Sequence, residues 1–175
     1  MPIQPEPERP SRCFAPVCDA DVRLLVLGSL PGQRSLAMQQ YYAHPQNQFW
    51  RLMSEVTGAS LVALPYEERL AGLLACGIGL WDVINEATRP GSLDTRITGA
   101  LPNDLAALLA SLPKLRAMAF NGKTASRIGR RQLAGTGSIT TDMALIDLPS
   151  SSPAYTLSYA EKARNWIMLR DWIGA

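Results

Sequence analysis

The sequence contains few of the residues that bind metals. Its 175 residues include three cysteines and one histidine, and Cys13 and Cys18 lack the two-residue gap usual in metal-binding motifs. A structural zinc site takes four ligands, and an iron–sulfur cluster is normally held by four thiolates. We therefore interpret the cysteines as reduced thiols or small core residues, and we expect neither a metal nor another cofactor.

Long apolar runs are also missing. No stretch approaches the roughly 20 residues that a membrane-spanning helix needs, so we expect no membrane partner. The first twelve residues alternate proline with charge and lack the apolar centre of a signal peptide. These features predict a flexible tail over residues 1–12, a single domain over residues 13–175, and a cytoplasmic location.

Charge of neither sign is strongly in excess. The net charge is +2 at pH 7, and charged residues make up 18% of the chain, which permits a polyanionic partner without requiring one. Basic residues cluster at 123–131 and at 162–164. Taken alone, each cluster is most simply interpreted as a solvated helix face.

Short apolar segments alternate with segments of helical periodicity. Apolar residues recur at helical spacing from Phe49 to Val56 and stop at Gly58, while Ser158 and Glu161 form a capping box that begins a last helix. The predicted strands are 22–28, 78–84, 115–120 and 144–149, and further helices are predicted near 66–76, 104–111 and within 121–131. The segment 85–102 is polar and rich in turn residues, which predicts a surface loop.

This alternation predicts an α/β fold with three layers, α/β/α, around a mostly parallel sheet of about four strands. In such folds, ligands bind beyond the carboxyl ends of the strands. Each compositionally unusual stretch follows a strand end, namely 28–50, 85–96, 121–124 and 149–156. We therefore expect these four stretches to converge on one face and to form the site.

Two of these stretches suit contacts from the backbone. "GSLPG" (28–32) lets N–H groups approach a ligand closely, but it lacks the Walker lysine and the G-x-G-x-x-G spacing. Alone it is equally a tight turn. "LPSSSPAY" (148–155) offers three hydroxyls suited to phosphate oxygens. A flexible serine linker is the alternative, which its place between a strand and a capped helix disfavours.

The stretch "YYAHPQNQFW" (41–50) is the most unusual. Phe49 opens the periodic helix and belongs to the core, whereas Tyr41 and Tyr42 precede the proline, where a flat ring can face a ligand. Asn47 is either a structural amide of the turn or a ligand-binding group. His44, beside Pro45, is expected to brace the turn rather than to catalyse.

In this order, these stretches resemble the uracil-DNA glycosylase superfamily. Its mismatch-specific branch has a GxNPG turn followed by F-A-H-P-x-N-x-F-W, where this chain has "YAHPQNQFW". The turn "GSLPG", with "LWDVINEATRPGSLD" downstream, is closest to the branch of hypoxanthine-DNA (deoxyinosine) glycosylases. The resemblance covers about residues 13–173 and implies a uracil-DNA glycosylase-like fold.

The resemblance implies a DNA repair glycosylase that extrudes a damaged base, hypoxanthine and also uracil, and hydrolyses its N-glycosidic bond to leave an abasic site. No lysine nucleophile is indicated near the motifs, so the enzyme is expected to be monofunctional. The expected partner is double-stranded DNA with a deaminated base, bound by a monomer associated with the nucleoid. The alternatives are a uracil or mismatch glycosylase and a catalytically idle DNA-binding member.

The resemblance also assigns roles to single positions. Leucines at 30 and 148 replace the polar groups that hold water and steady the leaving base in most relatives, which leaves Asn47 as the catalytic residue. An amide is too weak a base to deprotonate water, so Asn47 would act by positioning and electrostatics. Asp82 lies near the position from which relatives read the base edge, and a structural acid is the alternative there.

The other site residues follow from the same correspondence, with Tyr42 as the stacking aromatic. The residues expected to bind the base are Gly28, Ser29, Leu30, Pro31, Gly32, Tyr42 and Asp82. Those expected to contact DNA are Ser35, Lys123, Ser150, Ser151, Ser152 and Pro153. Ser152 matches the leucine with which relatives fill the vacated gap in the duplex, but it is too small, so Pro153 or Tyr155 would have to substitute.

Overall fold

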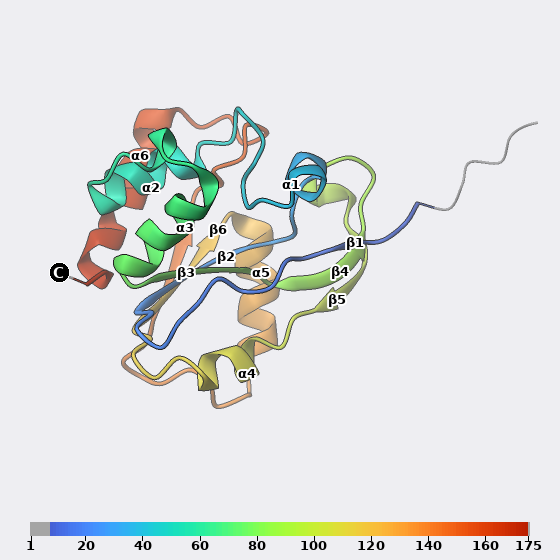
Figure 1. Ribbon diagram of the computed structural model, residues 1–175. Coiled ribbons are helices and arrows are strands. Elements are labelled where there is room, and N and C mark those ends of the chain that lie inside the picture. The colour runs from blue at the N-terminus through green and yellow to red at the C-terminus, as the bar shows by residue number, and fades with distance from the viewer. Residues whose placement is uncertain (1–7, 175) are drawn as a thin grey trace, which may run out of the picture.

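The computed structural model describes residues 8–174 (Figure 1). Its centre is a parallel sheet of four strands in the order β3-β2-β6-β7. The strands are Leu24–Gly28 (β2), Ile78–Asp82 (β3), Ala117–Asn121 (β6) and Ala144–Leu148 (β7). The predicted three-layer α/β/α fold with about four parallel strands is confirmed, and each strand lies inside its predicted segment to within one residue.

Strand β2 is buried along its whole length because it lies between two neighbours and between two helical layers. Leu24 and Val26 point into one core cluster, and Leu25 and Leu27 point into the other. This explains why the segment is uniformly apolar rather than alternating. The strand ends at Gly28, beside the end of β3.

Helices cover both faces of the sheet. One layer contains α2 (Phe49–Thr57), α3 (Tyr66–Ala75), α6 (Tyr159–Trp166) and the 3₁₀ helix η3 (Ile167–Trp172). The other contains α4 (Leu105–Ala110) and α5 (Lys123–Leu133). At Gly129, α5 approaches β6 so closely that a Cβ atom would overlap the ring of Phe120.

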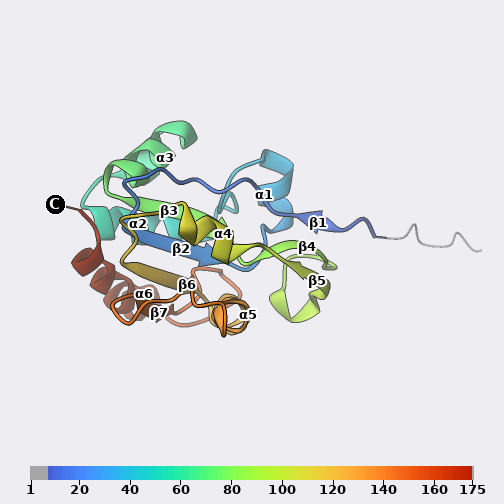
Figure 2. The same cartoon turned by 90° about the horizontal axis from the view of Figure 1, so that it is seen from below.

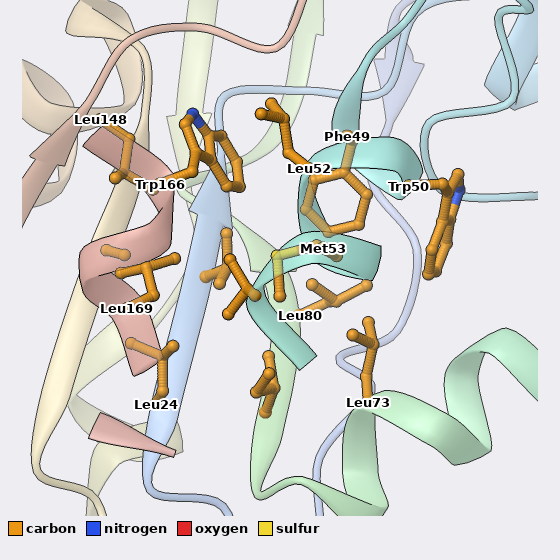
Figure 3. Close-up of a cluster of buried hydrophobic side chains, with 14 of the residues drawn as sticks. Leu24, Phe49, Trp50, Leu52, Met53, Leu73, Leu80, Leu148, Trp166 and Leu169 are labelled. Atoms are coloured by element: carbon orange, nitrogen blue, oxygen red, sulfur yellow. The ribbon is translucent and has the colours of Figure 1, made fainter. Parts of the chain in front are cut away.

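The first layer encloses a large aromatic and aliphatic core (Figure 3). Phe49 and Trp166 meet edge to face there, with ring centroids 5.9 Å apart. The predicted periodic helix is confirmed as α2, which ends at Gly58 with φ 74°. The capping box is confirmed too, since Ser158 and Glu161 bond each other's backbone at the start of α6.

The prediction of a surface loop over residues 85–102 was wrong. Strands β4 (Ile84–Thr88) and β5 (Thr98–Pro102) form an antiparallel hairpin, and β1 (Ser11–Arg12) completes a second sheet in the order β1-β4-β5. All of β5 is exposed, so its sequence carries no apolar alternation that would mark it as a strand. Figures 1 and 2 place this sheet at the end of the molecule away from the C-terminus.

Part of the predicted tail is also structured. Ser11 and Arg12 pair with β4, and the Arg12 guanidinium bonds the Glu86 carboxylate at 3.0 Å; residues 1–7 lie outside the described residues. Three short helices had no sequence signal, namely α1 (Gln33–Met38), η1 (Leu61–Ala63) and η2 (Asp94–Arg96). Across residues 8–174, no helix has the length and apolar character that crossing a bilayer requires.

Candidate active site

A cavity of about 680 Å³ opens at the carboxyl ends of the parallel strands. All four unusual stretches contribute to its wall, as predicted, so segments far apart in the chain meet there. This volume is in the range of small-molecule sites. The predicted site residues all line it: Gly28, Ser29, Leu30, Pro31, Gly32, Ser35, Tyr42, Asn47, Asp82, Lys123, Ser150, Ser151, Ser152 and Pro153.

Three residues converge at the deepest part of this wall. The strand register places Gly28 directly beside Asp82. A Cβ atom at Gly28 would lie 2.6 Å from Asp82 Oδ1 and 3.0 Å from Tyr42 Oη. Glycine is therefore required at this position, because any side chain would displace the carboxyl or the hydroxyl group.

Asp82 is a buried acid without a partner. It is 3% exposed, and its Oδ2 has no hydrogen bond among the described residues. Burial raises the pKa of Asp82 to about 7, while Arg89 opposes this rise and Asp94 adds to it. A carboxyl group with this pKa can donate a proton near neutral pH, and the structural-acid interpretation would require a bond that it does not make.

Tyr42 is held in a left-handed backbone conformation, with φ 54°. Few residues other than glycine adopt this region, so surrounding contacts must impose it. Its ring lies on Phe49, and its hydroxyl stays protonated because burial, and next the Asp82 charge, raise the pKa of Tyr42. The neighbouring Tyr41 is instead a core residue, 4% exposed, whose hydroxyl donates to the Ala15 carbonyl.

Asn47 is a structural amide of the turn that also lines the cavity, so its role as a ligand-binding group stays a prediction. Its Oδ1 accepts from the Phe49 N–H at 3.0 Å, which fixes the start of α2. Its Nδ2 donates to no other group within residues 8–174, and the residue lines the cavity. His44 braces the same turn, as expected, because its Nδ1 accepts from the Gln46 N–H and its carbonyl from the Asn47 N–H.

The sequence model of the uracil DNA glycosylase superfamily matches residues 15–173, which include every element of the central sheet and the whole cavity wall. The chain belongs to the uracil DNA glycosylase superfamily. The resemblance found in the motifs is thereby confirmed.

Relatives and a solved structure agree with this membership. A protein of Methanosarcina acetivorans named hypoxanthine DNA glycosylase is 39% identical over 155 residues, which are 89% of this chain and 94% of that protein. One of Methanosarcina barkeri with the same name is 43% identical over 110 residues, covering 63% and 70%. The solution NMR structure of a Methanosarcina acetivorans protein assigned to the uracil DNA glycosylases has a TM-score of 0.81 and 36% identity, covering 94% and 99%.

The structure also places the two leucines that stand where the motif resemblance implies polar groups. Leu30 and Leu148 line the cavity, yet they are only 6% and 5% exposed and belong to opposite core clusters. Neither can hold water. The wall also contains polar residues that sequence analysis did not single out, among them Asn121.

Asn121 lies at the end of β6. It is 8% exposed, its Nδ2 donates to Ser151 Oγ and its Oδ1 accepts from the Ser151 N–H, both at 2.9 Å. It also lies beside the Tyr42 hydroxyl. The sequence did contain a signal for Asn121, because this polar residue ends an apolar strand just before Gly122. It also lies in the stretch 121–124, which was expected to reach the site.

The serine loop, residues 149–156, is held in place by a buried lysine of α6. Lys162 is 1% exposed, and its Nζ donates to the Ser152 carbonyl at 3.1 Å. The interpretation of residues 162–164 as a solvated face was therefore wrong for Lys162. Ser151 and Ser35 are also internal, since Ser35 Oγ accepts from the Ala43 N–H.

The three cysteines are free thiols, and residues 8–174 hold no group of three or more acidic, His or Cys residues arranged for a metal.

Proposed function

We propose that this protein is a DNA repair glycosylase that extrudes a deaminated purine, hypoxanthine, and hydrolyses its N-glycosidic bond. The observation that carries the proposal is the single cavity shared by Asn47, Tyr42 and Asp82. Binding a base needs an aromatic ring for stacking and an amide for polar contacts. Protonating the base needs an acid that keeps its proton near neutral pH, which a carboxyl group of raised pKa does. The shared name of the two Methanosarcina relatives supports hypoxanthine as the substrate.

Binding of the base would rest on stacking and on the motif turn. The exposed side of the Tyr42 ring offers a platform, and stacking on an aromatic contributes about 1–3 kcal/mol per base. Stacking distinguishes bases poorly, so specificity falls to polar groups at the edge. The turn 28–32, Asp82 and Asn121 supply donors and acceptors for the N1–H and O6 of hypoxanthine.

Cleavage of the bond would run ahead of water attack, through an oxocarbenium-like transition state. The bond between C1′ and N9 breaks with its electron pair leaving on the base, and Asp82 donates the proton that neutralises it. Water then adds to C1′ and releases a proton to solvent. Asn47 Oδ1 keeps a second lone pair, beside its bond to Phe49, with which to hold this water.

Contact with the DNA strand is assigned to the cavity rim. Lys123 is exposed at the start of α5 and suits a phosphate, as do the hydroxyls of Ser150 and Ser152. Pro153 has no N–H, so we assign it packing against the DNA strand rather than a phosphate bond. We assign Ser35 and Ser151 to support instead, because their hydroxyls are buried and bonded inside. The cavity is complete within one chain, which supports action as a monomer on double-stranded DNA.

An incision assay tests this function. Duplexes with one deoxyinosine, one deoxyuridine or a normal base are incubated with the protein and then treated with alkali, which breaks the strand only at an abasic site. Strand breaks with deoxyinosine, and none before alkali, are expected. Breaks with deoxyuridine alone would indicate a uracil or mismatch enzyme. Tight binding without product from any duplex would indicate a DNA-binding member without activity.

A further inference from the structure

A buried arginine connects the second sheet to the motif turn. Arg89 follows β4, and its side chain is 2% exposed. Its Nη2 donates to the carbonyl groups of Leu30, at 3.3 Å, and of Pro31. Its Nη1 bonds Asp94 Oδ1 at 3.0 Å. The guanidinium thus reaches from the hairpin into the backbone of the turn.

Asp94 completes the connection from the other side of the hairpin. Both of its carboxylate oxygens accept from Ser29 Oγ, at 2.8 and 2.9 Å. Ser92 Oγ also accepts from the N–H of Gln33, at 3.0 Å, at the start of α1. The hairpin therefore bonds three consecutive residues of the turn, Ser29 to Pro31, and the residue that follows it.

These bonds fix the direction of the peptide groups in the turn. A trans peptide is planar, so a bound carbonyl also fixes the N–H on the opposite side of the same peptide. Arg89 holds the Pro31–Gly32 peptide, and with it the Gly32 N–H, in this way. The Leu30–Pro31 peptide has no N–H, so the bond to the Leu30 carbonyl fixes its plane alone. The Leu30 N–H is fixed through the Ser29 carbonyl, which accepts from the Ile84 N–H of the hairpin. Within residues 8–174, the N–H groups of Leu30 and Gly32 donate to no protein acceptor, and both residues line the cavity.

We propose that Arg89 and Asp94 are positioning residues that clamp the turn 28–32 in the shape that receives the extruded base. This inference rests on the proposed function. A buried guanidinium is costly unless its hydrogen bonds are satisfied. Here the bonds of Nη1 and Nη2 go to Asp94 and to the turn carbonyls, whereas Nε has no acceptor among residues 8–174. The hydrogen bonds of Arg89 therefore connect the hairpin to the turn of the site rather than to residues of the hydrophobic core.

The charges of Arg89 and Asp94 also act on the ionisation of Asp82. The ionisable groups that face Asp82 are Arg89, Asp94, Tyr41, Tyr42 and Cys13. Arg89 lowers the pKa of Asp82, whereas Asp94 raises it. Removing either charge should therefore shift the Asp82 ionisation, and the two shifts should have opposite signs. A general loss of structure around Asp82 would instead move the two midpoints in the same direction.

The test compares Asp94→Asn, Arg89→Gln and Glu86→Gln. Asp94→Asn is nearly isosteric and keeps an acceptor for Ser29, so it should fold. Glu86→Gln is the matched control, because it breaks the other ion pair of the same hairpin, with Arg12, away from the cavity. Single-turnover excision of hypoxanthine is measured against pH for each, and ¹³C NMR follows the Asp82 carboxyl.

We expect excision at pH 6 to fall about tenfold to a hundredfold in both clamp variants and to stay within twofold of wild type in Glu86→Gln. The Asp82 midpoint should move down in Asp94→Asn and up in Arg89→Gln. Rates like those of the control, or midpoints that do not separate, would overturn the proposal.

The same variants separate the clamp from the proposed function. If the wild-type protein excises nothing, the glycosylase proposal fails, and amide hydrogen exchange decides the clamp by itself. The N–H groups of Val83 and Ile84 donate to the Gly28 and Ser29 carbonyls of the turn. Faster exchange at these two N–H groups in the two clamp variants, but not in Glu86→Gln, would support it. Equal exchange in all three variants would refute it.

Discussion

The ring of Tyr42 lies flat on the ring of Phe49, with centroids 3.8 Å apart and planes 18° apart. Phe49 has no exposed surface and belongs to the core of α2. A core residue thus supports one face of Tyr42, a residue of the cavity wall, and we propose that a base stacks on the other face. The platform is rigid because the core fixes Phe49.

Removing the Tyr42 ring should weaken base binding without unfolding the site. Tyr42→Ala is expected to lower excision by about 5-fold to 150-fold, the equivalent of 1–3 kcal/mol of stacking. Tyr42→Phe keeps the platform and should retain most of the binding. Single-turnover rates and affinities for a duplex with a non-cleavable deoxyinosine analogue would measure both variants. Equal losses in the two would assign the effect to the hydroxyl group.

Substituting Asn47 should remove catalysis and leave DNA binding nearly intact. Asn47→Ala is expected to slow excision by about 10²–10³-fold, as for the loss of a preorganised polar group. Because Ala also removes the bond to the Phe49 N–H, Asn47→Ser is the control, since a hydroxyl can remake this local turn. Slow excision with wild-type thermal stability in Asn47→Ser would confirm a chemical role. Equal losses of excision and binding in Asn47→Ala would make the residue structural.

Excision should depend on the protonated form of Asp82. With a pKa of about 7, the rate should be level below pH 7 and fall tenfold per pH unit above it. Asp82→Asn should remove this dependence and lower the rate at pH 6 by about 10²–10⁴-fold. A profile that keeps its descending limb in Asp82→Asn would assign the proton to another group.

Asp82 should also make the folded state less stable as the pH rises from about 4 to about 7. Its pKa is higher in the folded protein than in the unfolded chain, so the folded state alone keeps this proton between about pH 4 and pH 7. The contribution of Asp82 to the free energy of unfolding therefore falls through this window and stays low above it. Asp82→Asn should be more stable than wild type at pH 9, by up to about 4 kcal/mol, as chemical denaturation at both pH values would show.

Tyr155 is expected to fill the space that the base vacates. It is 41% exposed on the cavity rim, and the Lys162 ammonium lies 5.6 Å from its ring centroid. Tyr155→Ala should slow excision from duplex DNA about tenfold, since extrusion costs a few kcal/mol, but not from a single strand. Met168→Ala is the control, because Met168 is 64% exposed and lies outside the cavity wall. Equal slowing on both substrates would exclude the role.

The sequence was most informative where local rules and burial agree. The apolar run of β2 and the period of α2 each follow from one segment, so both were predicted. The convergence of four stretches also followed, because parallel strands place their carboxyl ends at one edge. The family was recognised from the motifs and is confirmed by the match over residues 15–173.

What the sequence did not reveal depends on contacts between distant segments. Strand β5 is fully exposed and pairs through its backbone alone, so composition suggested a loop. Lys162 resembles any helix lysine until its ammonium is placed against the Ser152 carbonyl. The roles of Arg89 and Asn121 likewise depend on bonds to distant partners. Arg89 bonds Leu30, 59 residues away, and Asn121 bonds Ser151, 30 residues away.

Both faces of strand β2 are buried, which limits the substitutions that this strand can accept. Its side chains alternate between the two core clusters, so an exchange in the strand must be matched by repacking on one side of the sheet or the other. Leu93, Thr95, Ala154 and Leu157 border the same cavity but belong to neither core cluster. Descendants that prefer another lesion should therefore vary at these margins, over an unchanged strand.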